Sequence, residues 1–212
     1  MASRLIRPVT GPGVVYVVDD DESVLRALGR LIRSVGLEVE TFSSAAMFMK
    51  RTVSDLPACL VLDVRLAGKT GLDLQSDLGE AQRVLPIIFL TGYGDIPMSV
   101  RAMKRGAFDF LQKPCDDRQL LDAIGRALVR SREGHAEIAQ HRELQRRVGT
   151  LTPREREVLA LVVTGKLNKQ IAVELGAAEK TIKVHRGRMM KKMRAESVAE
   201  LVTMAQKISL PA

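Results

Sequence analysis

Carboxylate side chains follow two short apolar segments in the first third of the chain. The acidic run Asp19–Glu22 comes directly after apolar residues 14–18, and Asp63 ends the apolar run 59–63. If these runs are neighbouring parallel strands, their carboxyl ends meet at one edge of a sheet. Crowded carboxylates raise each other's pKa unless a hard divalent cation such as Mg²⁺ lies among them. An acidic loop that only caps the next helix would explain Asp21 and Glu22 but not Asp63.

A hydroxyl group and an ammonium group end two further apolar runs. Thr91 follows residues 87–90, and Lys113 comes shortly after residues 108–111. A carboxylate nucleophile, a divalent metal, a hydroxyl and a lysine are the groups that phosphoryl transfer needs, because they position the phosphoryl group and neutralise its oxygens. Each residue alone is weak evidence. Their places at successive strand ends together predict this chemistry.

These side chains can meet only if the strands that carry them run parallel. Apolar runs at residues 14–19, 39–42, 59–63, 87–90 and 108–111 are expected as strands, four of them buried on both faces. Amphipathic segments at residues 23–35, 43–51, 71–78 and 96–105 are expected as helices, the last with Pro97 in its first turn. Strict alternation of strands and helices predicts a doubly wound α/β sheet with the flavodoxin-like strand order.

From Asp117 onward the sequence pattern is helical. Apolar residues between 120 and 128 are followed by a polar stretch to residue 149, which predicts a solvated linker helix that breaks at Gly134 or continues to about Gly149. A charged spacer and a dimer-forming coiled coil both remain open for it, because its apolar positions are too few and too irregular for sustained heptads.

Positive charge is concentrated at the C-terminal end of the chain. Residues 131–212 hold 16 Lys and Arg against 9 Asp and Glu, whereas residues 1–130 hold 17 against 16. A helix expected at residues 179–193 places Lys180, Lys183, Val184, Gly187 and Lys191 on one face and Ile182, Met189 and Met193 on the other. It follows a helix at 168–175 and a tight turn at Gly176, which is helix-turn-helix order.

This basic helix suits the major groove of duplex DNA. Single-stranded nucleic acid is disfavoured, because its readers stack bases on aromatic rings and the chain has five Phe, two Tyr and no Trp. The candidates for base contacts are Lys180, Lys183, Val184 and His185. Arg186, Arg188, Lys191 and Lys192 are expected to contact phosphate or to serve the structure. Gly187 either permits close backbone approach to DNA or is idle.

The composition is that of a globular protein without a membrane anchor. Hydrophobic residues make up 46% and charged residues 27% of the 212 residues, and no run approaches the roughly 18 apolar residues of a membrane span. Residues 1–13 lack the apolar stretch of a signal peptide, so a cytoplasmic location is expected. Cys59 and Cys115 have neither metal-ligand spacing nor a disulfide pattern, and free thiols are expected.

The acidic and strand-end segments resemble receiver domains of response regulators, particularly the FixJ/StyR-like subgroup. The resemblance is carried by residues 17–21, 60–63, 91–95 and 108–114. It implies that Asp63 is the phosphoacceptor, and that Asp20, Asp63 and the Arg65 carbonyl bind Mg²⁺ directly while Asp19 binds it through water. It also implies that Thr91 and Lys113 bind the phosphoryl group, that Phe110 is an aromatic switch, and that the Lys113–Pro114 bond is cis.

The sequence departs from that family pattern at one position. Ala67 stands in the loop 66–68 where the family usually has a proline before the glycine. We expect a looser loop as a result, with an effect on the lifetime of the phosphoryl group.

The C-terminal segments are similar to the LuxR-type output domain of the FixJ and NarL regulators. Residues 151–159, 168–172 and 181–185 carry this resemblance. Together the two resemblances imply a CheY-like, five-stranded receiver over residues 1–128, a helical linker over 129–149 and an all-α helix-turn-helix domain over 150–212. The helix expected at 197–207 is implied to contribute to dimerisation.

The resemblances imply a two-component response regulator, which is not an enzyme. We expect a cognate histidine kinase to phosphorylate Asp63, and the chain to form a homodimer on phosphorylation or DNA binding. It would then act on double-stranded promoter DNA as an activator that recruits RNA polymerase.

Three other functions are compatible with parts of the sequence. A haloacid-dehalogenase-like phosphatase would use the aspartate after the first strand, Asp19, as its nucleophile. A one-component LuxR-type regulator would need an aromatic-lined ligand pocket, for which the chain has few aromatic residues. A phosphate-independent transcription factor with a vestigial receiver would normally lack one or more residues of the acidic pocket. Here all five are present: Asp19, Asp20, Asp63, Thr91 and Lys113.

Overall fold

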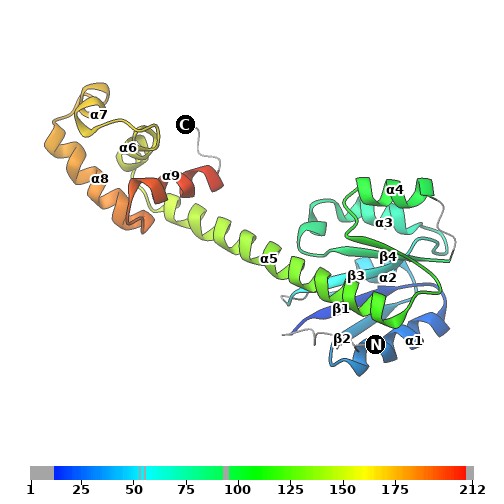
Figure 1. Ribbon diagram of the computed structural model, residues 1–212. Coiled ribbons are helices and arrows are strands. Elements are labelled where there is room, and N and C mark those ends of the chain that lie inside the picture. Colours follow the sequence, from blue (N-terminus) through cyan, green and yellow to red (C-terminus); the bar gives the residue numbers. More distant parts are fainter. Residues whose placement is uncertain (1–11, 53, 55, 93–95, 209–212) are drawn as a thin grey trace, which may run out of the picture. The chain divides into compact units, whose positions relative to one another are not determined.

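The computed structural model describes residues 12–208 except residues 53, 55 and 93–95 (Figure 1). The chain divides into two compact units, residues 1–135 and 136–212. This division lies within the segment 129–149 that the sequence assigned to a linker. The two units are described separately below.

The N-terminal unit is built around one parallel sheet. Its strands are β1 (Val14–Val18), β2 (Glu38–Phe42), β3 (Ala58–Asp63), β4 (Ile87–Thr91) and β5 (Asp109–Gln112). They lie in the order β2-β1-β3-β4-β5, and every neighbouring pair is parallel. The predicted flavodoxin-like fold is therefore confirmed, with the first and third strands adjacent.

Helices cover both faces of this sheet. They are α1 (Glu22–Ser34), α2 (Ala45–Met49), α3 (Gly71–Leu78), the 3-10 helix η1 (Gly79–Arg83), α4 (Ile96–Lys104) and the first part of α5 (Asp117–Gly149). Alternate residues of each strand point to opposite faces, so Tyr16 and Leu60 pack towards α2 and α3 while Val15 and Val61 pack towards α1 and α5. Both faces of the central strands are thereby removed from water.

Burial of the edge strands differs from the sequence prediction. Strands β1, β3 and β4 are buried on both faces, but β2 and β5 have exposed or half-buried residues at most positions. Three strands rather than four are therefore fully covered, because each edge strand has a neighbour on one side only. Helix α2 is also shorter than the predicted 43–51, since the Ser44 side chain accepts a hydrogen bond from the Met47 N–H and ends the helix on that side.

Helix α5 is continuous over Asp117–Gly149, so the break considered at Gly134 does not occur. Gly134 serves close packing instead, because a Cβ atom on it would lie 2.3 Å from the Arg83 carbonyl oxygen. One turn earlier, the fully buried Ser131 hydroxyl accepts a hydrogen bond from the Ala58 N–H (3.0 Å) and donates to the Val84 carbonyl (2.5 Å). These contacts attach α5 to the first residue of β3 and to the residue that follows η1.

The C-terminal unit is helical within its described residues. After the end of α5 come α6 (Pro153–Val163), α7 (Asn168–Glu174), α8 (Glu179–Met193) and α9 (Val198–Lys207). Thr152 and Glu155 form a capping box at the start of α6, and the Ser197 side chain caps α9. Gly176 takes a left-handed φ of 59° in the turn between α7 and α8, which confirms the predicted helix-turn-helix order.

Two further sequence predictions concern thiols and membranes. Cys59 and Cys115 are both free thiols, as expected. Within the described part of the chain, no helix combines the length and the apolarity needed to cross a bilayer.

Candidate functional site

The strand register brings the predicted acidic residues together at one edge of the sheet. Val18 of β1 lies opposite Leu62 of β3, so Asp19 and Asp63, each one residue further on, lie side by side. In the next two strands of the sheet, Thr91 is the last residue of β4 and lies opposite Gln112 of β5. Lys113 directly follows that pair, which places the predicted lysine at the same edge.

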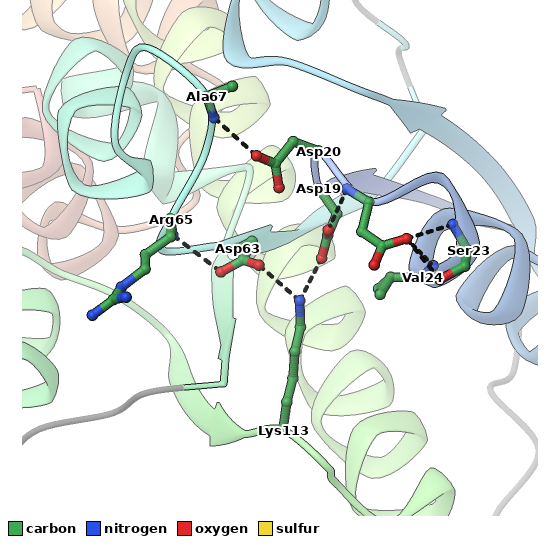
Figure 2. A network of polar contacts seen from close by, with 9 residues as sticks. Asp19, Asp20, Ser23, Val24, Asp63, Arg65, Ala67 and Lys113 are labelled. Atoms are coloured by element: carbon green, nitrogen blue, oxygen red, sulfur yellow. Dashed lines mark hydrogen bonds and ion pairs between the residues drawn. The ribbon is translucent and has the colours of Figure 1, made fainter.

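Lys113 forms ion pairs with two of the carboxylates. Its Nζ lies 2.5 Å from Asp19 Oδ2 and 2.7 Å from Asp63 Oδ2 (Figure 2). The Asp19 side chain is only 3% exposed, while the Asp63 side chain is 13% exposed. Asp63 is thus the more accessible of the two carboxylates that Lys113 holds.

Burial and charge act in opposite directions on this cluster. Loss of hydration raises the pKa of Asp19, although its hydrogen bonds with Lys113 and the Asp21 N–H act the other way. Burial by itself would lower the pKa of Lys113, but its hydrogen bonds with Asp19 and Asp63 outweigh burial and raise that pKa. Lys113 therefore stays cationic at neutral pH and compensates part of the negative charge.

The remaining negative charge suits a divalent cation. Asp19, Asp20 and Asp63 each offer a carboxylate oxygen, and these oxygens lie within 4.8 Å of one another. One lysine cannot neutralise three carboxylates, and hard oxygen donors are what Mg²⁺ takes in proteins. The residues present therefore fit the predicted metal.

Backbone N–H groups of the β3–α3 loop hold the carboxylates in place. The Arg65 N–H donates to Asp63 Oδ1 at 3.0 Å, and the Ala67 N–H donates to Asp20 Oδ2 at 3.1 Å (Figure 2). A proline at position 67 would have no N–H to donate. The alanine that departs from the family pattern therefore makes a direct contact with the pocket, which the sequence did not predict.

A glycine allows the loop to return close to the phosphoacceptor candidate. A Cβ atom on Gly71, the first residue of α3, would lie 2.3 Å from the Asp63 carbonyl oxygen and 3.1 Å from the Phe89 ring. Any other residue would push α3 away from the end of β3. The glycine is thus required by close packing behind Asp63.

Thr91 and Phe110, the predicted phosphoryl ligand and aromatic switch, differ in their exposure to solvent. Thr91 is 1% exposed, and the Lys113 N–H donates to its carbonyl oxygen at 2.6 Å. Phe110 is half-buried, with its ring centroid 6.2 Å from that of Phe89. The Lys113–Pro114 bond is cis, as the resemblance implied. Residues 93–95 of the motif 91–95 lie outside the described residues.

Helix α8 has the two faces that its sequence predicts. Ile182, Met189 and Met193 are fully buried in the core of the C-terminal unit. The opposite face is exposed to solvent at every position that the sequence assigns to it: Lys180, Lys183, Val184, Gly187 and Lys191. A basic surface of one helix is therefore available to a polyanion.

Two of the predicted phosphate contacts are engaged within the unit. Lys192 Nζ lies 2.6 Å from Oε2 of the buried Glu155 and 3.1 Å from the Thr150 carbonyl oxygen. Arg186 donates to Asn168 Oδ1 at 2.9 Å. Of the two uses that the sequence left open for these cations, phosphate contact or structure, the geometry favours structure for Lys192.

His185 and Arg188 differ in exposure. His185 is half-buried on α8, and Arg188 is exposed. Arg188 therefore remains a candidate for phosphate contact, whereas the half-buried position of His185 also suits a packing role.

Two family descriptions match separate parts of the chain. Residues 15–125 match the response regulator receiver domain, and residues 149–205 match the bacterial regulatory proteins of the luxR family. The first match contains the whole acidic pocket, and the second contains α8.

Relatives of similar length share both parts. The chain is 51% identical over 206 residues to nodulation protein W of Bradyrhizobium diazoefficiens, which covers 94% of this chain and 88% of that protein. It is 44% identical over 195 residues to the response regulator protein TodT of Pseudomonas putida, covering 92% and 86%. Its structure resembles that of the response regulator StyR, with a TM-score of 0.80, 45% identity, and coverage of 93% of this chain and 100% of that one.

Proposed function

Since the chain belongs to the response regulators that join a receiver domain to a LuxR-type DNA-binding domain, we propose that phosphorylation of Asp63 controls its binding to promoter DNA. A family of transcriptional regulators is not an enzyme class, so the phosphatase alternative has no support from its relatives. The observation that carries the proposal is the pairing of Asp63 with Lys113 at 2.7 Å beside two further carboxylates.

The pocket supplies the parts of a phosphoryl transfer from a histidine kinase. An Asp63 carboxylate oxygen attacks the phosphorus atom, the bond from phosphorus to the kinase histidine breaks, and an aspartyl phosphate forms. Bound Mg²⁺ would neutralise the carboxylates and the phosphoryl oxygens during this step. Asp20, Asp63 and the Arg65 carbonyl are the proposed direct ligands, and Asp19 would bind the ion through water.

The neighbouring residues hold the product and report its presence. The Lys113 ammonium group then pairs with the new phosphoryl oxygens, because the Asp63 carboxyl group loses its negative charge when it becomes an acyl phosphate. The Thr91 hydroxyl binds the same group, and Phe110 changes its rotamer as Thr91 moves. The surface formed by α4 and β5 then changes shape, which favours a receiver homodimer.

The output domain turns dimerisation into transcription control. Two α8 helices enter successive major grooves of a two-fold DNA site, where Lys180, Lys183, Val184 and His185 contact bases. Arg186, Arg188 and Lys191 hold phosphates or the helix itself, and α9 adds to the dimer contact. The bound dimer recruits RNA polymerase as an activator in the cytoplasm.

The proposed domain limits are those that the sequence resemblances imply. They place the receiver at residues 1–128, the linker at 129–149 and the DNA-binding domain at 150–212. The hydrogen bonds of Ser131 with Ala58 and Val84 support a close attachment of the linker's first turns to the receiver.

Phosphorylation-dependent DNA binding tests this function. Duplex fragments would be enriched from sheared genomic DNA by the wild-type protein incubated with acetyl phosphate and Mg²⁺. Fluorescence anisotropy would then compare the affinity of wild type and Asp63→Asn for these fragments, with and without acetyl phosphate. We expect acetyl phosphate to tighten binding by wild type only. Equal affinity of wild type in both states would contradict control through Asp63 and favour a vestigial receiver.

A further inference from the structure

The last turns of α5 belong to the core of the output domain. Leu144 is 4% exposed, and Val148 packs against the hydrophobic cluster that includes Leu151, Ile182 and Met193. The sequence pattern predicts a solvated linker helix for this part of α5. Val148 instead packs against the same core that supports the recognition helix α8.

Arg147 lies on this buried side of α5 and contacts the end of α8. Its side chain is 18% exposed, and its Nη1 donates to the Met193 carbonyl oxygen at 3.0 Å. Met193 is the last residue of α8, so its carbonyl has no partner within the helix. A cation at this end of a helix is also attracted by the negative end of the helix dipole.

Glu143 holds Arg147 in this position. Its Nε donates to Glu143 Oε1 at 2.9 Å, and Arg146 donates to both oxygens of the same carboxylate at 2.7 and 2.9 Å. The hydrogen bonds from Arg146 and Arg147 lower the pKa of Glu143 to about 2. Glu143 is therefore charged at neutral pH and keeps the Arg147 guanidinium oriented.

A lysine of α8 makes a second connection between that helix and the end of α5. Lys192, in the last turn of α8, reaches the Thr150 carbonyl oxygen at 3.1 Å and Glu155 at 2.6 Å. Thr150 follows α5 directly, and Glu155 forms the capping box of α6. The carboxyl end of α8 is thus held from two sides by the α5 terminus and the segment that follows it.

We propose that Arg147 is a positioning residue that sets the place of the recognition helix, so that DNA affinity depends on the last turn of the linker. Arg147 acts through the Met193 carbonyl and not by contact with DNA. This inference rests on the proposed function, because it takes α8 as the helix that reads DNA. It moves the working start of the DNA-binding domain from residue 150 back into α5.

Arg146 provides a matched control for the experiment. Its side chain is 63% exposed, and among the described residues its hydrogen bonds go to Glu143. Arg146→Ala and Arg147→Ala remove the same charge from adjacent positions of one helix. Any general electrostatic effect on DNA binding is therefore nearly equal in the two variants.

The test combines hydrogen–deuterium exchange with DNA binding by the full-length chain. We expect Arg147→Ala to speed exchange of the amides at residues 190–196 roughly tenfold and to weaken binding of the enriched duplex by a similar factor, as expected for loss of a charged hydrogen bond. Arg146→Ala should leave both values within about twofold of wild type. The slope of affinity against salt concentration should be equal in the two variants.

Several outcomes would overturn the inference. Unchanged exchange at residues 190–196 in Arg147→Ala would show that the contact does not hold α8. A salt slope reduced by about one charge relative to Arg146→Ala would make Arg147 a phosphate contact. If Arg147→Ala does not fold, Arg147→Lys replaces it, and a lysine that keeps the charge but not the two-sided contact should give intermediate exchange.

Failure of the proposed function would be seen separately. If wild type enriches no duplex although the amides of residues 190–196 respond to Arg147→Ala, DNA recognition by α8 is wrong while the packing is right. That result would overturn the proposed function and the claim on DNA affinity with it.

Discussion

Replacement of Gly134 by alanine tests how closely α5 is packed on the receiver. In the interior of a helix alanine is favoured over glycine by about 1 kcal/mol. Here the new Cβ would lie 2.3 Å from the Arg83 carbonyl oxygen and 3.3 Å from a methyl group of Val84. Because the nearest atom belongs to the backbone, α5 or η1 must shift, and overpacking of this kind costs about 2 to 3 kcal/mol. The expected result is a net loss of about 1 to 2 kcal/mol of receiver stability.

Hydrogen–deuterium exchange of the β3 amides in the full-length chain measures this loss, because it reports the receiver separately from the output domain. A loss of about 1 to 2 kcal/mol corresponds to exchange roughly 5- to 30-fold faster in the globally protected amides. Gly187→Ala is the control, since Gly187 lies inside α8 and a Cβ on it meets no atom within 4 Å. It should slow exchange in the output-domain core, in keeping with the helix preference for alanine alone.

Opposite signs for the same substitution are therefore expected at these two helical glycines. If Gly134→Ala left β3 exchange unchanged or slower, α5 would not be packed against η1 as the structure shows. The function of Gly134 as a close-contact residue would then be refuted.

Three further predictions concern other parts of the chain. Ser131→Ala should lower receiver stability in urea denaturation by about 1 to 3 kcal/mol, because a buried N–H and a carbonyl lose their partner, whereas Ser34→Ala, which removes an exposed hydroxyl, should have little effect. The pKa of Glu155 is lowered in the folded state by its hydrogen bonds with Lys192 and the helix cap, so its contribution to stability is present above an ordinary glutamate pKa of about 4.3 and is lost as pH falls through the lower folded value. Glu155→Gln should flatten the acid dependence of output-domain unfolding measured between pH 3 and 7, and a dependence as steep as that of wild type would exclude this carboxylate as its source. Lys183→Ala should weaken binding of the enriched duplex by about 1 to 3 kcal/mol. Lys192→Ala should instead destabilise the output domain and leave the dependence of DNA affinity on salt concentration unchanged. The reverse pattern would interchange the functions assigned to the two lysines.

Much of the receiver could be predicted because its signals are local. The alternation of strands and helices predicts a parallel sheet with a known strand order. Because Asp63 is the last residue of its strand, it must then lie at the carboxyl edge of that sheet. Helix α3 was predicted at the bounds 71–78 that the structure has. The buried face of α8 likewise follows from the spacing of Ile182, Met189 and Met193.

The remaining contacts depend on groups that carry no sequence signal. The Ala67 N–H that holds Asp20 is a backbone donor, which any residue except proline provides. Gly134 has the appearance of a helix breaker until its neighbour Arg83 is known. Lys192 belongs to a basic run, and only the three-dimensional structure shows its pairing with Glu155. The full burial expected for a fourth strand was wrong because apolar sequence does not reveal which strands lie at an edge.

Intact-mass analysis after incubation with acetyl phosphate and Mg²⁺ tests the central claim most directly. Asp63→Asn is the comparison, since it removes the proposed nucleophile and keeps the size of the side chain. The account predicts one labile phosphoryl group on wild type and none on the variant. No adduct on wild type, or an equal adduct on Asp63→Asn, would contradict phosphorylation at Asp63.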